Sequence, residues 1–259
     1  MIGGARIKRT DGTWTDKGGG GEQWVEPPPG MKPSAGVSLF QGWDWLTTAP
    51  LLDTGDVTDM TYMFLGCTSL TEIPLLDTSN VTNMTGMFAS CTSLTEIPLL
   101  DTSNVTNMTY MFNGCTSLTE IPLLDTSDAT NMTGMFNGCT SLTEIPLLDT
   151  SNATNMTGMF NDCTSLAAIE LDMSSITSST TTWGSIISNA LQSLTSLLTH
   201  GLTRSISVRW TALEAPALNA WFDSLGQAAT NATVTITGAP GAATCDRTIA
   251  TSKGWTVVG

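Results

Sequence analysis

The chain has very few basic residues and a single histidine. Its 259 residues include nine lysines and arginines against 23 aspartates and glutamates, which gives a formal net charge of −14. No lysine or arginine lies between Lys32 and Arg204. Because phosphate binding needs such cations, we expect no nucleic-acid partner. The acidic stretch either keeps the protein soluble through self-repulsion or favours cations, divalent metals or a basic partner.

Long apolar runs are also missing from the sequence. The longest fall far short of the roughly 18 residues that suggest a membrane-spanning helix, so we expect no membrane insertion. Met1–Thr10 has neither the apolar segment nor the small-residue cleavage site of a secretory signal. We therefore expect a protein that reaches its place of action without a leader.

The sequence offers little for catalysis. A nucleophile–histidine site would have to use His200, which we expect at a helix C-terminus instead. A glycosidase needs two carboxylates in unlike surroundings, whereas the carboxylates here recur in identical surroundings. We expect no enzyme, no catalytic residue, no metal ligand and no cofactor. Calcium held between stacked aspartates remains an alternative.

What dominates the chain is a 24-residue repeat. The consensus D-T-S-N-V-T-N-M-T-G-M-F-N-G-C-T-S-L-T-E-I-P-L-L recurs in five units, which start at Asp53, Asp77, Asp101, Asp125 and Asp149. A period of this length is typical of leucine-rich repeats, in which units stack along one axis and equivalent side chains form rows. The predicted fold class is an α/β solenoid, a leucine-rich-repeat stack of short parallel strands and short helices.

Each unit is expected to contain one short strand. Leu70, Ile73 and Leu75 match the strand pattern of leucine-rich repeats, with Pro74 at the exposed position between the last two. We expect the outward residues of this strand to form the binding surface. The candidates are Thr71, Glu72, Pro74, Thr95, Glu96, Pro98, Thr119, Glu120, Pro122, Thr143, Glu144 and Pro146.

A short helix is expected after each strand. Val81, Met84, Phe88 and Cys91 follow at offsets of 3, 7 and 10, which places them on one helical face. Gly86 weakens this helix, so a ragged or 3₁₀ turn is the alternative. The repeat cysteines should form a column of buried, free thiols, because parallel Cβ vectors disfavour disulfides. These are Cys67, Cys91, Cys115, Cys139 and Cys163, and Cys245 stands apart.

The composition divides the chain into four parts. Residues 1–36 are expected to form an extended docking arm and linker, 37–52 an aromatic N-terminal cap, 53–172 the five repeats, and 173–259 degenerate repeats and a C-terminal cap.

The arm is basic and contains a hairpin pattern with an Asp-Gly turn, followed by glycine-rich and proline-rich linkers. Lys8, Arg9 and Trp14 are the candidate anchoring residues.

The C-terminal part predicts a further strand–helix alternation. Trp183–Leu198 has the pattern of an amphipathic helix. It is followed by a strand over 205–210, a helix over 213–225, a strand over 233–237, a helix over 246–252 and a strand over 255–258.

The repeat residues D-T-S-N-V-T-N-M-T-G-M-F-x-x-C-T-S-L are similar to the BspA-like leucine-rich repeats, which occur on bacterial surface proteins and in some bacteriophage tail proteins. The C-terminal I-T-G-A-P-G-A-A-T-C-D-R-T-I-A-T-S-K-G-W-T-V resembles the ending of minor tail proteins of phages that infect actinobacteria. The N-terminal R-T-D-G-T-W-T resembles the D-G-x-W motif near their start. The Pro-Leu-Leu strand ending and the tight unit depart from the longer surface-protein repeats.

The resemblance implies a minor tail or tail-tip protein of a bacteriophage virion. It would bind a host cell-surface glycan or protein through the repeats, and other tail proteins through residues 1–36. Whether the arm forms a homotrimer stays open. The alternatives are a bacterial cell-surface adhesin and, less favoured, a cell-wall-acting hydrolase. The expected lack of a leader favours the phage protein over the adhesin, since an adhesin must cross a membrane.

Overall fold

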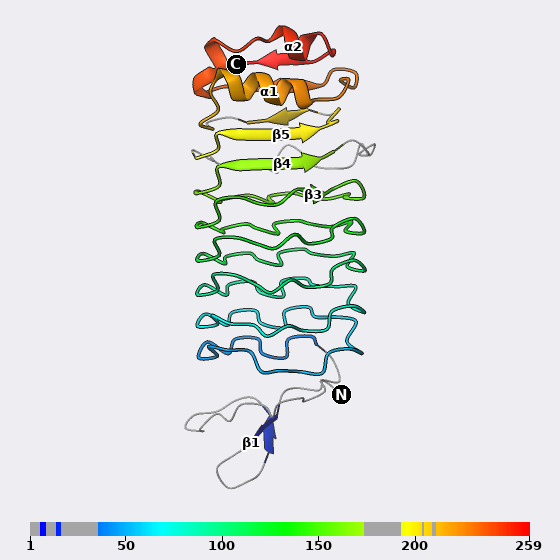
Figure 1. Ribbon diagram of the computed structural model, residues 1–259, viewed down its shortest axis with the longest axis vertical. Coiled ribbons are helices and arrows are strands. Elements are labelled where there is room, and N and C mark those ends of the chain that lie inside the picture. The colour runs from blue at the N-terminus through cyan, green and yellow to red at the C-terminus, as the bar shows by residue number, and fades with distance from the viewer. Residues whose placement is uncertain (1–5, 9–13, 17–35, 174–192, 204, 209–210) are drawn as a thin grey trace.

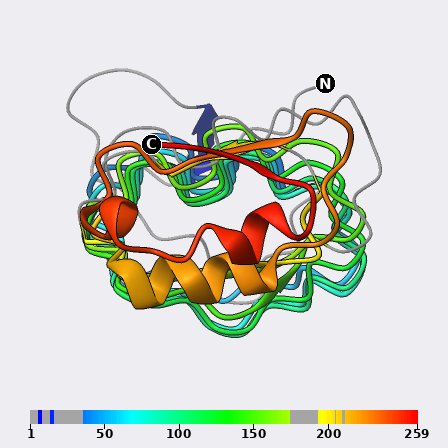
Figure 2. The ribbon, with the colours of Figure 1, turned by 90° about the horizontal axis from the view of Figure 1, so that it is seen from above.

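The molecule is a stack of similar coils along one axis (Figure 1), and the coils superpose when viewed down that axis (Figure 2). The structure, a computed structural model, describes residues 6–8, 14–16, 36–173, 193–203, 205–208 and 211–259. The strands are β1 (Arg6–Lys8), β2 (Trp14–Asp16), β3 (Leu148–Asp149), β4 (Ala168–Asp172), β5 (Ser196–His200), β6 (Ile206–Ser207), β7 (Thr233–Thr235) and β8 (Thr256–Val258). The helices are α1 (Ala215–Ser224), α2 (Thr248–Thr251) and the 3₁₀ helix η2 (Pro240–Ala243).

In the first four repeats, alternate backbone N–H groups of each coil donate to the next coil. In the second repeat these donors are Met84, Gly86, Phe88 and Ser90, with N···O distances of 2.9, 2.8, 2.9 and 2.6 Å. Corners between them are closed by bonds to the third residue back, as from Met87 N–H to the Met84 carbonyl at 3.2 Å. This arrangement consists of turns and contains no helix.

The short helix expected in each repeat is therefore wrong. A helix uses its N–H groups internally, four residues back, and leaves none for a neighbouring coil. Gly86 has φ of 57° and Ser90 has φ of 60°, so both lie in the left-handed region. Left-handed residues interrupt a right-handed helix, and here they turn the chain at the corners.

The proline of each repeat decides where a regular strand forms. At the strand segments of the repeats that carry this proline, an isolated parallel bridge joins Thr48 to Glu72, and the other isolated bridges, from Asp59 through Asn83, Asn107 and Asn131 to Asn155, run along a different segment of the coil. Where the proline is replaced by Glu170, the five-residue strand β4 forms and pairs in parallel with both β3 and β5. Proline has no N–H to donate to a ladder, so its loss restores the strand. Short parallel strands with few helices fit a leucine-rich-repeat-like fold.

The proline also changes which leucine faces the core. In β4, Ile169 and Leu171 are buried on either side of exposed Glu170, which is the expected alternation. In the first repeat's strand segment, by contrast, Leu75 is 68% exposed and Leu76 is 2% exposed. The expectation that Leu75 faces inward is wrong.

The pairing register gives the physical reason. β3 pairs with β4 so that Leu148 lies opposite Leu171, 23 residues on and not 24. The segment Ile-Pro-Leu-Leu thus carries one residue more than Ile169-Glu170-Leu171 between its buried positions. As in a β-bulge, the extra residue is left outside the pairing, and here it points outward.

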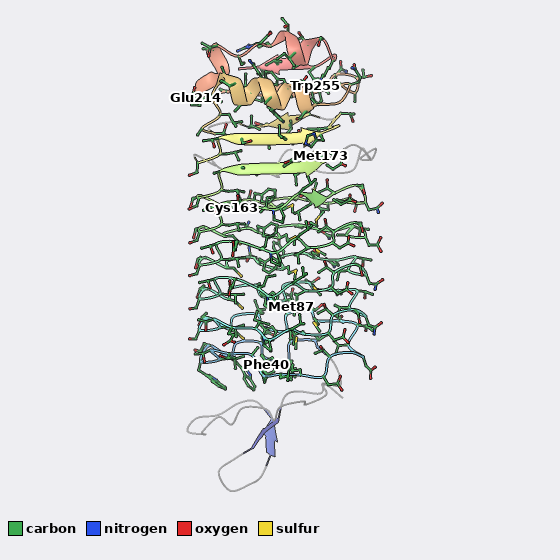
Figure 3. All side chains as sticks on the ribbon, in the orientation of Figure 1. Phe40, Met87, Cys163, Met173, Glu214 and Trp255 are labelled. Atoms are coloured by element: carbon green, nitrogen blue, oxygen red, sulfur yellow. The ribbon has the colours of Figure 1, made fainter. Side chains whose placement is uncertain are left out.

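Rows of identical side chains fill the core. Phe64, Phe88, Phe112, Phe136 and Phe160 are fully buried and stack with ring centroids 5.6–5.8 Å apart. The two methionines that precede each phenylalanine in a repeat are also fully buried; Met87 is labelled in Figure 3. Each ring gains from its neighbours both buried area and favourable aromatic contact.

The cysteine column is confirmed. All five repeat cysteines are free and buried, and each Sγ donates to a phenylalanine carbonyl 27 residues earlier, as from Cys91 to Phe64 at 3.1 Å. Burial raises the pKa of the Cys115 and Cys163 thiols to about 12, and it also raises the pKa values of Cys91 and Cys139.

Aromatic side chains gather in the first described coil, at residues 36–52; that they act as a cap stays a prediction. Phe40 is fully buried and stacks on Phe64 at 5.3 Å. Trp43 meets Phe40 edge-to-face at 5.1 Å and stacks on Trp45 at 5.2 Å. Phe40 thus extends the Phe row by one ring.

The C-terminal part follows the expected order of strands and helices from β6 to β8. α1 buries Leu218, Trp221 and Phe222 against the last coils, and β6, β7 and β8 form a parallel sheet. The expected helix over 183–198 is wrong at its end, because residues 196–200 form β5; most of its remainder lies outside the described residues. No helix in the described ranges has both the length and the hydropathy required to cross a bilayer.

The two neighbouring leucines provide a test of the register. We expect Leu76→Ala to lower the free energy of unfolding by about 2–5 kcal/mol, because it opens a cavity in a packed row. Leu75→Ala should change it by at most about 0.5 kcal/mol, because that side chain is mostly in solvent. Urea denaturation of both variants measures this, and equal losses would contradict the observed register.

The thiol column predicts a chemical reactivity pattern. In the native protein at mildly alkaline pH we expect Cys245, which is half-buried, to react with a colorimetric disulfide reagent, while the five buried thiols stay silent. All six should react in denaturant. Fast reaction of the column in the folded protein would show that the thiols are not buried as described.

Candidate binding surface

One row of exposed residues runs along the stack at the strand segment of each repeat. The predicted threonines and glutamates of this row are all exposed, and the prolines are half-buried. The structure thus brings together the predicted residues Thr71, Glu72, Pro74, Thr95, Glu96, Pro98, Thr119, Glu120, Pro122, Thr143, Glu144 and Pro146. We call this surface the strand face.

The sequence analysis missed an apolar part of the strand face. Leu75, Leu99, Leu123 and Leu147 are 50–68% exposed, and Leu51 at 57% extends their row by one coil. The signal was the doubled leucine after each proline, because two adjacent residues of an extended chain do not both face the core.

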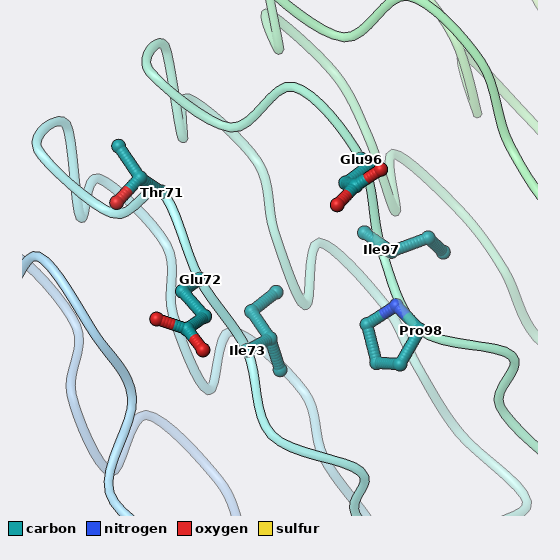
Figure 4. Close-up of a pocket in the computed structure, with 6 residues that line it drawn as sticks. All are labelled: Thr71, Glu72, Ile73, Glu96, Ile97 and Pro98. Carbon is teal, nitrogen blue, oxygen red and sulfur yellow. The ribbon is translucent and has the colours of Figure 1, made fainter.

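Two shallow hollows lie between neighbouring coils of the strand face. The first has a volume of about 350 Å³ and is lined by Thr71, Glu72, Ile73, Glu96, Ile97 and Pro98 (Figure 4). The second, of about 290 Å³, is lined by Glu120, Ile121, Glu144, Ile145 and Pro146. Each hollow therefore combines two carboxylates from adjacent coils with an apolar floor.

The backbone holds the strand face in place. The Thr71 N–H and hydroxyl both donate to the Thr47 carbonyl, at 2.8 and 3.0 Å. In the third repeat Thr119 bonds to the Thr95 carbonyl in the same way, at 3.1 and 3.3 Å. Since the threonine hydroxyls donate within the stack, the outward chemistry of this face comes chiefly from carboxylates and leucines. Such a surface suits a partner with apolar groups and positive charge, and repels anions.

The aspartate that starts each repeat serves the turn. Asp77 Oδ1 accepts the Ser79 N–H at 3.1 Å and the Ser79 hydroxyl at 2.7 Å, and Asp125 does the same with Ser127. The serine hydroxyl and N–H bonds lower the pKa of Asp77 and of Asp125.

Within the part of the chain that the structure describes, no three His, Cys, Asp or Glu side chains are placed to hold a metal ion. Calcium held between stacked aspartates stays a prediction.

His200 does not lie at a helix end. It is the last residue of β5, and its Nε2 lies 2.8 Å from Oε1 of Glu170 on β4, with both side chains about half exposed. An exposed pair of this kind contributes little to stability.

Only part of the predicted arm lies within the described residues. β1 and β2 form the expected antiparallel hairpin, and the backbone places Lys8 directly opposite Trp14. Arg9 lies outside the described residues. The role of these residues in anchoring stays a prediction.

The turn aspartates make stability depend on pH. The folded pKa of each lies below the ordinary pKa of an aspartate, so its contribution to stability is present above that ordinary pKa and is lost as pH falls through the folded pKa. The double change Asp77→Asn and Asp125→Asn keeps an acceptor oxygen without a titrating group. We expect urea denaturation to show a smaller loss of stability on acidification for this variant than for the wild type, and identical acid profiles would refute the assignment.

Comparison with known proteins gives one family and one structure. A family model described as "Mycoplasma protein of unknown function, DUF285" matches residues 38–121 and 95–197, which together cover more than half of the chain. The crystal structure of the T. pallidum Leucine Rich Repeat protein is similar at 20% sequence identity and a TM-score of 0.35, over 55% of this chain and 74% of that one. No curated protein matches the sequence.

The family match spans the first cap, all five repeats and the start of the C-terminal part. It supports the resemblance to BspA-like leucine-rich repeats, which rested on the same residues. The chain belongs to the family described as Mycoplasma protein of unknown function, DUF285.

Proposed function

We propose that this chain is a non-enzymatic minor tail or tail-tip protein of a bacteriophage. Its repeats form a leucine-rich solenoid that binds the host cell surface, and residues 1–36 anchor it to other tail proteins. The observation that carries the binding role is the strand face, where leucines are exposed in successive coils. A continuous exposed apolar row on a soluble protein marks an interaction site.

The family supports surface binding, because BspA-like repeats occur on proteins that act at cell surfaces. The repetition adds a physical argument. A partner that contacts several coils at once gains avidity, since each further contact forms at high effective concentration. Weak leucine and glutamate contacts then suffice for firm attachment.

The virion location is supported by the two ends of the chain. The resemblance to phage minor tail proteins rests on the C-terminal stretch from Ile236 and on the N-terminal Asp-Gly-Thr-Trp segment, and both lie outside the family match. The cell-surface adhesin is the second candidate, favoured by the family's description, which names a bacterium.

Immunogold labelling separates the two locations. An antibody raised against the purified chain is applied to phage particles and to bacterial cells from the same culture. We expect gold at the tail tip of the particles. Gold on the wall of cells that carry no particles would overturn the virion location in favour of the adhesin.

The strand face itself is tested by substitution. The change Leu75→Ser, Leu99→Ser and Leu123→Ser should lower binding of the purified chain to host cells about tenfold or more, because apolar anchors dominate interfaces. Thr106→Ala and Thr130→Ala, on another exposed row, form the control. Binding is measured by flow cytometry after thermal unfolding shows that both variants fold. Equal binding by the leucine variant and the wild type would exclude the strand face.

A further inference from the structure

The chain has two tyrosines, and both occupy the same position of the repeat. Tyr62 and Tyr110 lie two coils apart and are 37% and 43% exposed. In the remaining repeats this position is glycine, at Gly86, Gly134 and Gly158. Tyrosine and glycine thus alternate along the first four coils, and we call this the tyrosine row.

The backbone is left-handed at every residue of the tyrosine row. Tyr62 and Tyr110 have φ of 56° and 55°, close to the 57° and 58° of Gly86 and Gly134. Glycine adopts this conformation without strain, whereas a bulky residue does so at a cost. Side chains kept in strained conformations cluster at functional sites, so the position calls for an explanation beyond folding.

Each tyrosine ring lies against the glycine of the following coil. A Cβ added to Gly86 would lie 2.5 Å from two ring carbons of Tyr62, and one added to Gly134 would meet the Tyr110 ring just as closely. Any residue larger than glycine at that position would clash with the tyrosine ring of the coil before. The tyrosine and the glycine one coil later therefore act as a pair.

The backbone at each tyrosine is held by the next coil. The Tyr62 N–H donates to the Thr85 carbonyl at 2.8 Å, and the Tyr110 N–H donates to the Thr133 carbonyl at 2.8 Å. The next residue in each case, Met63 or Met111, is fully buried. Backbones fixed in this way reduce the entropy that a ligand would otherwise remove on binding.

The surroundings and the spacing define the ligand. Neighbouring coils of a stack lie about 4.8 Å apart, so the two rings are separated by about 10 Å along the axis. The residues next to the tyrosines in sequence carry polar groups that bond within the stack. The Thr61 hydroxyl donates to the Asp59 carboxylate and the Thr109 hydroxyl to the Asn107 amide oxygen, both at 2.6 Å. No lysine or arginine occurs between Lys32 and Arg204, which disfavours nucleic acids and other anionic chains.

We propose that Tyr62 and Tyr110 are two stacking platforms for a neutral, β-1,4-linked glycan. The C–H face of a pyranose ring packs on an aromatic side chain, and sugar hydroxyls pair with neutral amides and hydroxyls. Successive sugars of an extended β-1,4 chain face opposite ways, so the same face recurs every disaccharide. That recurrence matches platforms placed at every second coil. The site lies nearly half a coil from the strand face in sequence, and it does not depend on a location in a virion.

Calorimetry with the purified full chain tests the proposal. The probes are the hexasaccharides and disaccharides of chitin and of cellulose, and the α-1,4-linked maltohexaose. We expect at least one β-1,4 hexasaccharide to bind. The matching disaccharide should bind at least about tenfold more weakly, because a disaccharide reaches a single platform. Maltohexaose should bind no better than the disaccharide, because its chain is curved.

The repeat itself supplies the matched variant. Tyr62→Gly with Tyr110→Gly installs the residue that the other coils carry, so the backbone is relieved of strain and the fold is retained. We expect this variant to lose hexasaccharide binding by about tenfold or more, with thermal unfolding checked in parallel. Tyr62→Phe with Tyr110→Phe keeps the stacking surface and should keep most of the affinity. Glu72→Gln with Glu96→Gln, on the strand face, should bind like the wild type.

The outcomes that overturn the proposal are distinct. One is the failure of both β-1,4 hexasaccharides to bind the wild type. Another is equal binding by the glycine variant, and a third is equal affinity for maltohexaose. Binding of an unglycosylated protein to the tyrosine row, without binding of either hexasaccharide, would assign the row to a protein partner and would also overturn the glycan site.

Discussion

Backbone hydrogen bonds between successive coils are the constraint on which the other features depend. Alternate N–H groups from Met84 to Ser90 point along the axis to the next coil, at 2.6–2.9 Å. A helix leaves no N–H groups free for this, so the segment turns at left-handed corners instead. Because the first four repeats make the same bonds, residues 24 apart are held one above another, and the rows in the core and on the surface follow.

The rows in turn explain why the repeat varies so little inside. A phenylalanine that stacks on two identical rings at 5.6–5.8 Å has no room for a larger neighbour and leaves a gap beside a smaller one. A Cys91 thiol that donates to the Phe64 carbonyl also needs that carbonyl in place. Substitutions in one coil thus affect the coils on both sides. Some outward positions are coupled as well, as Tyr62 is to Gly86, but exposed side chains such as Leu75 leave room for change.

Much of this arrangement was predictable from the sequence, and the misses share a cause. The period, the free cysteine column, the aromatic group around Phe40 and the helix α1 follow from residue spacing and type. The phase of Leu75 and Leu76 did not, because it depends on one extra residue beside Pro74, which the β3–β4 register reveals. The turns at Gly86 and Ser90 were missed for a related reason. Inward spacing of 3, 7 and 10 arises equally from a helix and from corners whose N–H groups bond to another coil. The sequence indicates the tyrosine row, because both tyrosines occupy the same position of the repeat. Their exposure and their left-handed backbone appear only in the structure.

The two surface rows differ in period, and that difference separates their ligands. Leucine and glutamate recur in successive coils of the strand face, which suits a partner that presents an even apolar surface over several coils. Tyr62 and Tyr110 recur at every second coil, which suits a partner whose own repeat is twice as long. A rigid row of this kind rejects ligands of the wrong repeat length, because only the first contact then forms well and the avidity of the second is lost. One 24-residue sequence period thus carries two surface spacings, because the tyrosine position alternates with glycine while the leucine position is the same in successive coils.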